Sequence, residues 1–292
     1  FMITTKDMSY HPEAMANLTD ASTRHSWAET FYMPFAVPEL GLFGSAYVMA
    51  RPGVGVTTSD VKIYQGLGRT RLDALYSDNQ TQIPAPAAFE NFTLPTGLAC
   101  DLSTGPARYR VSYEGIDDTR FDIDAQAIMP AYDIHDSSMD PMAAKTDQDR
   151  AAGSGYGAAY GGHYDQLCRI RGQLTVRGKD YAIDYVDCMD RSWGVRPERA
   201  LQPMAWLHAI FGEDYAFHGI WSMNYAAASD AQHSFAHGFV LDNGQVHGCT
   251  AGKVIVTRDG IWGAHYEIHA TDVRGKQHRF LGAPVASGLW EP

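Results

Sequence analysis

The chain of 292 residues is 45% hydrophobic and carries 23 basic and 34 acidic side chains, a formal net charge of -11 at pH 7. This length and composition suit a soluble globular protein of one large domain or two ordinary ones. The acidic balance argues against a nucleic-acid or anionic-membrane surface, because both require a basic footprint. We therefore expect a small molecule as the partner and no membrane insertion, and we allow for a homodimer.

Cysteine usage and the chain ends bear on the expected location. The four cysteines lack the C-x-x-C spacing and the dense framework of disulfide-rich secreted domains; they are Cys100, Cys168, Cys188 and Cys249. The first residues do not resemble a signal peptide, and no window is long and apolar enough to span a membrane. We expect a reduced, cytoplasmic protein. The end at Pro292 has no polar tail, which is consistent with a native chain that extends beyond it.

Short β-rich runs separated by turn residues dominate the first half of the chain. After a short helix within 11–21, we expect strands at 44–50, 55–64, 69–76, 89–94, 109–113 and 121–129. The region 130–162 is polar and ends in a Gly-rich loop, 151–162. This loop lacks the Gly-Lys-Ser/Thr ending of a phosphate loop, so we interpret it as a mobile loop or pocket lid.

The second half shows the same pattern. We expect a hairpin of 167–176 and 181–186, followed by strands at 204–211, 216–225, 234–241, 246–257, 261–271 and 278–281. Asn243-Gly244 and Asp259-Gly260 are strong hairpin turn signals. Long amphipathic helices are absent after Pro130, so the sequence predicts an all-β protein of two antiparallel β-barrels or half-barrels packed together. Such barrels leave no free sheet edge and can hold one small ligand.

The densest group of charged and aromatic residues is 187–197, which reads Asp-Cys-Met-Asp-Arg-Ser-Trp-Gly-Val-Arg-Pro directly after the predicted hairpin. Acids beside a bulky aromatic just after a strand indicate side chains at a pocket wall, where an acid has a reason to be functional. The alternative, weighed evenly for Asp190, is a structural ion pair with Arg191 or Arg196.

This motif and its approach resemble a known superfamily. The order His163-Tyr164-Asp165-Gln166, an Ile-Arg-Gly hairpin and Asp190-Arg191-Ser192-Trp193-Gly194 is similar to that of the tandem lipocalin-like proteins, which include carotenoid 1,2-hydratases, kievitone hydratase, AttH-type proteins and fungal lipocalin-like Diels-Alderases. The resemblance is greatest to uncharacterised bacterial members whose motif reads Asp-His-Ser-Trp-Gly. It implies two lipocalin-like β domains, which we place at 2–186 and 187–292.

The resemblance also implies roles for individual residues. In the hydratase branch the motif reads Tyr-His-Asp-His-Asn-Trp-Gly, and its first Asp is thought to protonate an alkene; that acid falls on Asp190 here. The Tyr falls on Cys188, and an upstream His-x-aromatic pair falls on His163, with Asp165 in the aromatic position. The acid and the histidine therefore remain, for a proton transfer that need not be hydration.

Simple chemistry supports the same roles. An acid that protonates a double bond or a leaving hydroxyl must be neutral at working pH, which burial achieves by penalising the charged form. We expect Asp190 as the acid and His163, beside Asp165, as a base or water-orienting group. Aromatic faces would shelter a cation. The candidate substrate-binding residues are Cys188, Trp193, Tyr185, Trp206, His208, His218, Trp221, His237, Trp27 and Glu29.

Two further points concern Glu29 and the histidines. In a strand Glu29 shares a face with Trp27 and could point into the first barrel, although a solvent-facing position is favoured. His265 and His269 share one face of a helix or a strand, but no His-Glu-x-x-His pattern is present. Pocket-lining histidines are therefore favoured over a metal site. The sequence also has no dinucleotide fingerprint and no Gly-x-Ser-x-Gly elbow, so no cofactor is expected.

The sequence therefore predicts a cofactor-independent lyase or isomerase, that is, a hydratase, dehydratase, isomerase or cyclase. It would act by acid-base proton transfer on a hydrophobic small molecule of terpenoid, steroid or aromatic type. The alternative is a non-catalytic lipocalin-like carrier of a hydrophobic ligand. A carrier would retain its ligand unmodified, and Asp190→Asn would have little effect on that binding.

Overall fold

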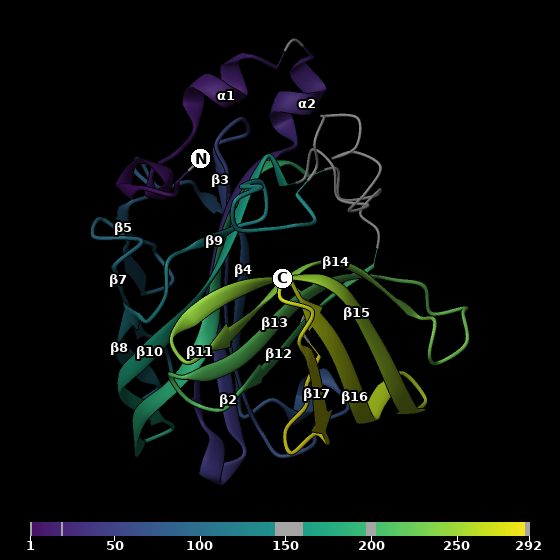
Figure 1. The fold of residues 1–292 in the computed structure, drawn as a ribbon. Coiled ribbons are helices and arrows are strands. Elements are labelled where there is room, and N and C mark those ends of the chain that lie inside the picture. The colour runs from purple at the N-terminus through teal and green to yellow at the C-terminus, as the bar shows by residue number, and fades with distance from the viewer. Residues whose placement is uncertain (1, 19, 144–159, 197–202, 290–292) are drawn as a thin grey trace. The chain divides into compact units, whose positions relative to one another are not determined.

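The computed structural model describes residues 2–18, 20–143, 160–196 and 203–289 (Figure 1). These residues form an all-β structure of two curled antiparallel half-barrel sheets, which confirms the expected fold class. Most of the expected Gly-rich loop, residues 151–159, lies outside the described residues, as does Pro197.

The helical segments are short, and none that the structure describes is long and apolar enough to cross a membrane. They are η1 (Thr5–Met8), α1 (Pro12–Ala16), α2 (Ala21–His25), η2 (Pro38–Leu40) and η3 (Arg71–Asp73). The prediction of a strand at 69–76 is wrong for the residues before Tyr76. There the Asp73 carboxylate accepts hydrogen bonds from the Arg69 and Thr70 amides and closes a capping box, so the strand begins only at Tyr76.

The strands occupy most of the remaining described chain. They are β1 (Trp27–Val37), β2 (Leu42–Arg51), β3 (Val56–Gln65), β4 (Tyr76–Pro84), β5 (Asn91–Thr93), β6 (Leu98–Asp101), β7 (Arg108–Glu114), β8 (Arg120–Ala127), β9 (Tyr132–Asp133), β10 (Gly162–Val176), β11 (Lys179–Val195), β12 (Met204–Ile210), β13 (Tyr215–Met223), β14 (His233–Asp242), β15 (Gln245–Asp259), β16 (Trp262–Asp272) and β17 (Gln277–Gly282).

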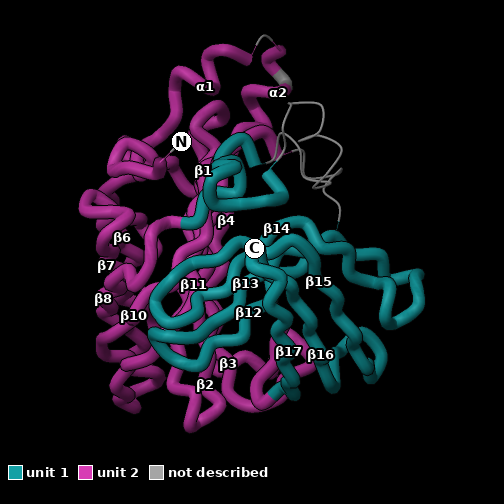
Figure 2. Tube along the Cα trace, in the orientation of Figure 1, with its two compact units in different colours: residues 1, 132–162, 197–284 teal, residues 2–131, 163–196, 285–292 magenta. Residues whose placement is uncertain are grey.

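The chain divides into two compact units (Figure 2). The large unit consists of the described residues within Met2–Ala131, His163–Arg196 and Val285–Pro292, and the small unit of those within Tyr132–Gly162 and Pro197–Pro284. The units are therefore interleaved along the sequence. The boundary that the sequence placed between residues 186 and 187 lies inside strand β11.

The large unit contains a long sheet in the order β4-β3-β2-β1-β11-β10-β8-β7-β6-β5. Its two longest strands, β10 and β11, form the expected hairpin, and they are joined by Arg177-Gly178 with φ of 48° and 78°. Positive φ at both central residues is the geometry of a type I′ turn, whose twist matches that of paired strands. One face of the sheet covers a continuous core that includes Phe31 and Phe35 of β1 and Met189 of β11.

Strand β11 is longer than the sequence predicted. It continues through the charged motif to Val195 instead of ending at residue 186, so the motif lies within a strand and not after one. Successive side chains in a strand point to opposite faces of the sheet. Met189, Arg191 and Trp193 therefore face the core, and Asp190 and Ser192 face the other side.

A buried ion pair occupies the core side of this motif. Arg191 Nη2 donates a hydrogen bond of 2.7 Å to Glu29 Oε2, and both side chains are fully buried. Trp27 Nε1 donates to Glu29 Oε1 at 3.0 Å. The guanidinium also lies 4.4 Å from the centre of the Phe89 ring and 5.2 Å from that of Trp193. Each charge is therefore compensated inside the core.

The same cluster attaches the N-terminal segment to the sheet. His11 stacks on Trp193 with ring centres 4.0 Å apart, and its backbone N–H donates to Glu29 Oε1 at 2.9 Å. Arg191 Nη2 also donates to the Ser9 carbonyl at 2.9 Å. The segment before α1 is thus held by contacts to β1 and β11. The sequence favoured a solvent-facing Glu29, and this prediction is wrong because the side chain is buried.

The small unit contains a six-stranded antiparallel meander in the order β12-β13-β14-β15-β16-β17. The Asn243-Gly244 turn between β14 and β15 has φ of 52° and 75°, as its sequence predicted. The rings of Phe217 on β13 and Phe280 on β17 stack 5.3 Å apart although these strands are not neighbours. The sheet therefore curls around its own core, which includes Trp221 and Val254.

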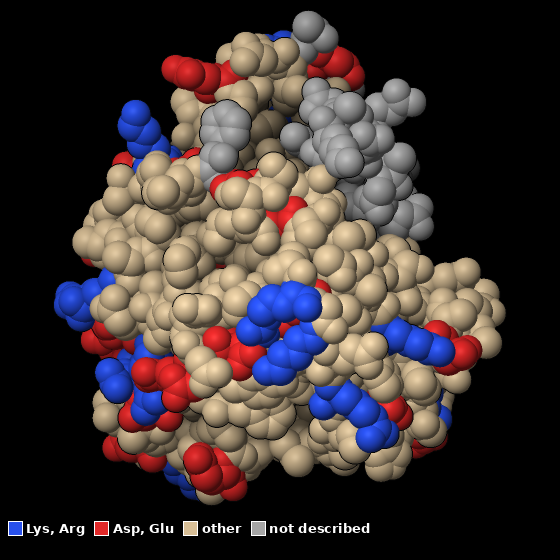
Figure 3. All heavy atoms as spheres, in the orientation of Figure 1, with Lys and Arg blue, Asp and Glu red and all other residues tan. Residues whose placement is uncertain are grey.

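The charged surface agrees with the acidic composition. On the face drawn in Figure 3, the described Lys and Arg residues lie singly or in small groups beside Asp and Glu, and they form no continuous basic area. The face drawn in Figure 3 thus offers no basic footprint of the kind that a nucleic-acid partner needs. Among the described ion pairs, the Arg274 guanidinium donates to Asp242 at 2.8 Å and to Asp272 at 2.6 Å.

The first prediction concerns the Glu29–Arg191 pair. Arg191→Met should lower the free energy of unfolding by about 3–5 kcal/mol, because it leaves a buried carboxylate without its partner. The double variant with Glu29→Gln should recover part of that loss, since neither charge then remains in the core. Urea unfolding followed by circular dichroism measures both effects.

Arg171→Met is the matched control, because Arg171 pairs with Asp184 at 3.1 Å while 63% of its side chain is exposed. An exposed pair contributes about 0–1 kcal/mol. Equal losses for Arg191→Met and Arg171→Met would show that the buried pair does not stabilise the large unit.

Candidate active site

The candidate site lies on the face of the large sheet that points away from its core. On β10, Tyr164 and Cys168 belong to the core, so the alternation of the strand places His163 and Asp165 on the opposite face. Asp190 of β11 lies on that face as well. All three side chains are buried, and their residues are 0%, 1% and 4% exposed. The three predicted catalytic residues thus share one face of two neighbouring strands.

His163 and Asp165 form a close pair. The His163 Nε2 and the Asp165 Oδ2 atoms are 2.9 Å apart, so the ring donates a hydrogen bond to the carboxylate. Burial alone lowers the pKa of His163. The charge of Asp165 and this hydrogen bond outweigh that effect, so the pKa lies above the usual 6.5. The pair resembles the general arrangement in which a carboxylate orients an imidazole and stabilises its protonated form.

Asp190 has the properties expected of an acid that holds its proton. Burial raises its pKa from 3.8 to about 7, the Asp165 carboxylate adds to the rise, and His163, Arg196 and Arg191 oppose it. Among the described residues, its carboxyl makes no hydrogen bond and no ion pair. A carboxyl that is buried without such partners favours the neutral form.

The two arginines beside Asp190 are engaged elsewhere. Arg191 pairs with Glu29 on the core side of the sheet, and Arg196 donates hydrogen bonds to the Ser192 hydroxyl and, at 3.5 Å, to the Tyr47 hydroxyl. Ser192 is also bonded to Thr30 of β1, with 2.7 Å between the two hydroxyl oxygens. Within the described residues, no ion pair joins Asp190 to either arginine, although both charges act to lower its pKa.

Two tyrosines that are not among the predicted site residues stand in line with the acid. Tyr32 of β1 lies directly opposite Asp190 of β11 on one side and Tyr47 of β2 on the other, so the three form one row across the sheet. Burial raises the pKa of both phenols, and the nearby Asp190 carboxylate contributes to the rise. They are therefore neutral aromatic rings beside the acid. The alternating sequence from Trp27 was the only signal that could have placed Tyr32 on this face.

A second acid on β11 is held more firmly. Asp187 accepts hydrogen bonds from the Tyr185 hydroxyl at 3.0 Å and from the Cys188 amide at 2.8 Å. Burial raises its pKa to about 6, and the two hydrogen bonds limit the rise. Cys188, on the face of Asp190, is buried, and its pKa is raised well above the usual value by burial and by Asp165 and Asp187. Its thiol is therefore neutral.

The remaining candidates of the large unit lie on its core side. Trp27, Glu29 and Trp193 belong to the buried cluster around Arg191, described above. Their contacts to one another account for their burial. These three residues therefore lie close to one another, on the opposite side of the sheet from Asp190.

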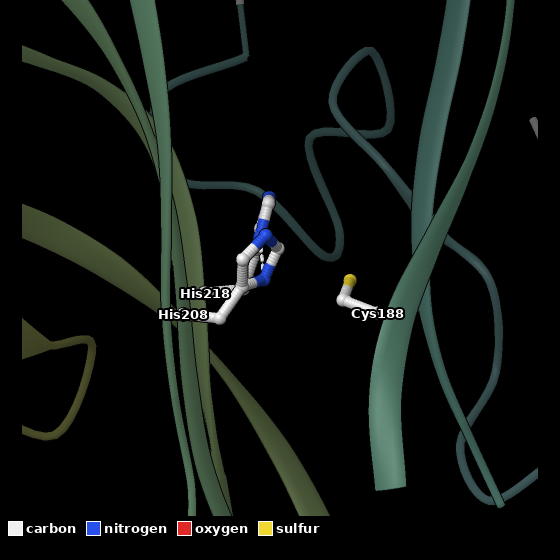
Figure 4. Close-up of side chains that lie close together, drawn as sticks. All are labelled: Cys188, His208 and His218. Carbon is white, nitrogen blue, oxygen red and sulfur yellow. Dashed lines mark hydrogen bonds between the residues drawn. The ribbon is translucent and has the colours of Figure 1, made fainter. Parts of the chain in front are cut away.

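The small unit holds the other predicted residues. His208 of β12 lies directly opposite His218 of β13, and Trp206 lies opposite Ile220. His237 of β14 also lies opposite Ile220, so these residues share one face of the sheet. Figure 4 shows the two imidazoles of His208 and His218 side by side.

Two details complete this face. The His237 Nδ1 atom is 2.7 Å from Oδ2 of the fully buried Asp140, a partner that sequence reasoning did not identify. Trp221, by contrast, belongs to the core of the small unit on the other face. There its ring lies over Gly252, where a Cβ atom would come within 2.4 Å of it.

Solved structures of related fold were found at low sequence identity. Kievitone hydratase from Nectria haematococca is 11% identical with a TM-score of 0.51, over 92% of this chain and 77% of that one. CghA is 10% identical with a TM-score of 0.53, over 88% and 74%. The chain therefore has the lipocalin-like fold of these proteins, and at such identities the similarity establishes the fold alone.

The sequence comparison places the chain in a family. Residues 14–292 match the family described as "Domain of unknown function (DUF7064)", so the chain belongs to the DUF7064 family. No curated protein matches it in sequence.

The second prediction follows from the raised pKa of Asp190. The folded protein holds a proton that the unfolded chain releases near pH 4, so the stability of the wild type falls as pH rises towards about 7. Asp190→Asn removes this loss. Between pH 5 and pH 8 its stability relative to wild type should rise by about 2–3 kcal/mol, since one pKa unit is worth about 1.4 kcal/mol. Urea unfolding at each pH measures the difference.

Asp184→Asn is the control on the same strand. Hydrogen bonding and charge from Arg169 lower the pKa of Asp184, so its contribution is already complete at pH 5. Its stability relative to wild type should not change from pH 5 to pH 8. If the Asp190→Asn curve also runs parallel to wild type, Asp190 does not have a raised pKa.

Proposed function

We propose that this protein is a lyase or isomerase that moves protons on a hydrophobic small molecule, with Asp190 as the acid and the His163–Asp165 pair as the base. The observation that carries the proposal is a buried carboxyl, without a hydrogen bond or ion pair among the described residues, whose pKa is about 7 and which lies on the same sheet face as an oriented imidazole. Groups that titrate near the working pH are the most effective proton donors and acceptors. Strongly perturbed buried acids are also concentrated at functional sites.

The proton balance can be written for hydration and its reverse. Neutral Asp190 gives its proton to one carbon of a double bond, which leaves a cation at the other carbon. Water adds to that cation and passes its extra proton to His163. Proton transfer from the imidazolium to the Asp190 carboxylate then restores both groups. In the reverse direction Asp190 protonates a hydroxyl, water leaves, and His163 takes a proton from the neighbouring carbon.

The residues around the acid suit such a cation. Tyr32 and Tyr47 stand in the same row as Asp190 and present neutral aromatic rings. The faces of aromatic rings attract cations by about 0.5–2 kcal/mol each. Asp165 compensates the charge on His163 after proton uptake. An isomerase or cyclase would use the same donor and acceptor without a net gain of water.

The name of one structural neighbour points in the same direction. Kievitone hydratase is called a hydratase, and its fold is shared by this chain. This supports the reaction class of the proposal, while a terpenoid, steroid or aromatic substrate rests on the resemblance of the motif and on the aromatic row.

The third prediction tests the acid directly. Purified protein is incubated with a mixture of isoprenoid and aromatic compounds in oxygen-18 water, and products are identified by mass spectrometry. We expect a labelled gain of water, a loss of water or a rearranged product of unchanged mass. Asp190→Asn should lower the rate by about 10²–10⁴, the usual contribution of a general acid.

Asp187→Asn is the matched control, since it makes the same change three residues away at an acid that is already hydrogen-bonded. It should retain most of the activity. Turnover that is unchanged in Asp190→Asn would refute the assignment. Recovery of one unmodified compound from the wild type, with no product, would instead establish a carrier.

The fourth prediction concerns pH. The active form needs a neutral Asp190 and a neutral His163. The rate should therefore fall as pH rises above about 7, where Asp190 loses its proton, and should also fall at low pH, where His163 is protonated. A steady-state profile from pH 5 to pH 9 with the substrate found above would show a bell-shaped curve. A rate that keeps rising from pH 7 to pH 9 would contradict the role of Asp190 as the acid.

A further inference from the structure

The small unit contains two histidines whose ring nitrogen atoms lie unusually close to each other. His208 and His218 occupy directly opposite positions on β12 and β13, and their Nδ1 atoms are only 3.1 Å apart. The two rings are 4.8 Å apart between centres and are inclined by 36° (Figure 4). In both rings it is therefore the Nδ1 atom that faces the other ring.

The separation of these atoms fits two ligands of one metal ion. Bonds from an imidazole nitrogen to Zn²⁺ are about 2.0–2.1 Å long, so two nitrogens 3.1 Å apart subtend an angle of roughly 100° at the ion. That angle lies between the octahedral and tetrahedral values. Imidazole is also a preferred ligand of zinc, copper and nickel. In the absence of metal the same distance corresponds to an N–H···N hydrogen bond between the two rings.

The surroundings of the pair suit a site that is fixed on one side and open on the other. His218 is fully buried, and its ring centre lies 5.3 Å from that of Phe239 on β14. His208 belongs to the exposed residues of β12. One ligand is therefore held by the packing of the sheet, while the other can admit an ion and its water molecules.

The geometry also distinguishes His208 and His218 from His265 and His269, the two histidines whose sequence spacing had suggested a metal site. His265 and His269 lie four residues apart on one strand, β16. At about 3.3 Å per residue their Cα atoms are about 13 Å apart, and His269 is engaged with Glu267 at 2.8 Å. Opposite positions on neighbouring strands bring Cβ atoms within about 5 Å. A cross-strand pair can therefore chelate an ion where this pair on one strand cannot.

We propose that His208 and His218 bind a divalent transition-metal ion, of the zinc or copper type, through their two Nδ1 atoms. The ion takes the place of the proton shared by the rings, which moves to Nε2 of its own ring so that both imidazoles bind as neutral ligands, and water supplies further ligands on the open side. The proposal rests on the geometry of these two histidines and not on the proton transfer proposed for Asp190.

The test uses the chelator-treated full chain and Zn²⁺ as the probe. Competition with a chromophoric chelator should show one equivalent of bound Zn²⁺ in the wild type. His208→Gln should weaken that binding at least tenfold, and His218→Gln should do the same. His265→Gln, at an exposed histidine of the same unit, is the matched control and should bind as the wild type does. Nitrogen-15 NMR of the histidine rings should show that Zn²⁺ shifts two Nδ1 resonances.

Each outcome decides the proposal. Loss of binding in His208→Gln, with circular dichroism unchanged, supports it even if His218→Gln does not fold, because His208 is exposed. Equal Zn²⁺ affinity in the wild type and His208→Gln would overturn the proposal, and so would the absence of one-equivalent binding in the wild type. The titration measures Zn²⁺ binding without any substrate, so a failed activity assay and a failed metal titration remain distinguishable.

Discussion

The two-residue alternation of strand β11 is the constraint on which the large unit depends. One short motif supplies Arg191 and Trp193 to the core and Asp190 and Ser192 to the opposite face. A shift of the strand by one residue would exchange these sets. Asp190 would then enter the core, and Arg191 would lose Glu29. The contacts that fix the register of β11 therefore also fix the position of the acid.

Two buried acids on neighbouring strands illustrate how the surroundings determine charge. Burial raises the pKa of Glu29, but Arg191 and the hydrogen bond from His11 outweigh it, so the pKa is lowered and the group is charged. Asp190 is buried as well, yet it has no such bond among the described residues, and its pKa rises. The first arrangement stabilises the fold, whereas the second costs stability near neutral pH. A cost of this kind is typical of functional sites.

Much of the fold could be predicted from the sequence, because strand alternation and turn chemistry are local. Asn243-Gly244 predicted its hairpin, and the meander 204–282 was recognised nearly strand by strand. The extent of β11 was missed, since a run of charged residues does not look like a buried strand. The burial of Glu29 was missed because its partner Arg191 is 162 residues away. For the same reason the sequence did not reveal that Asp140 is the partner of His237, or that Tyr32 lies directly opposite Asp190.

The most direct test of the account is the titration of Asp190 itself. Carbon-13 NMR of protein labelled at the aspartate carboxyls, with Asp190→Asn to identify the resonance, follows its protonation from pH 3 to pH 9. The account predicts a midpoint near pH 7. A midpoint near pH 4, the value of an ordinary exposed aspartic acid, would contradict it, because the carboxyl would then be charged at neutral pH and could not serve as the proton donor.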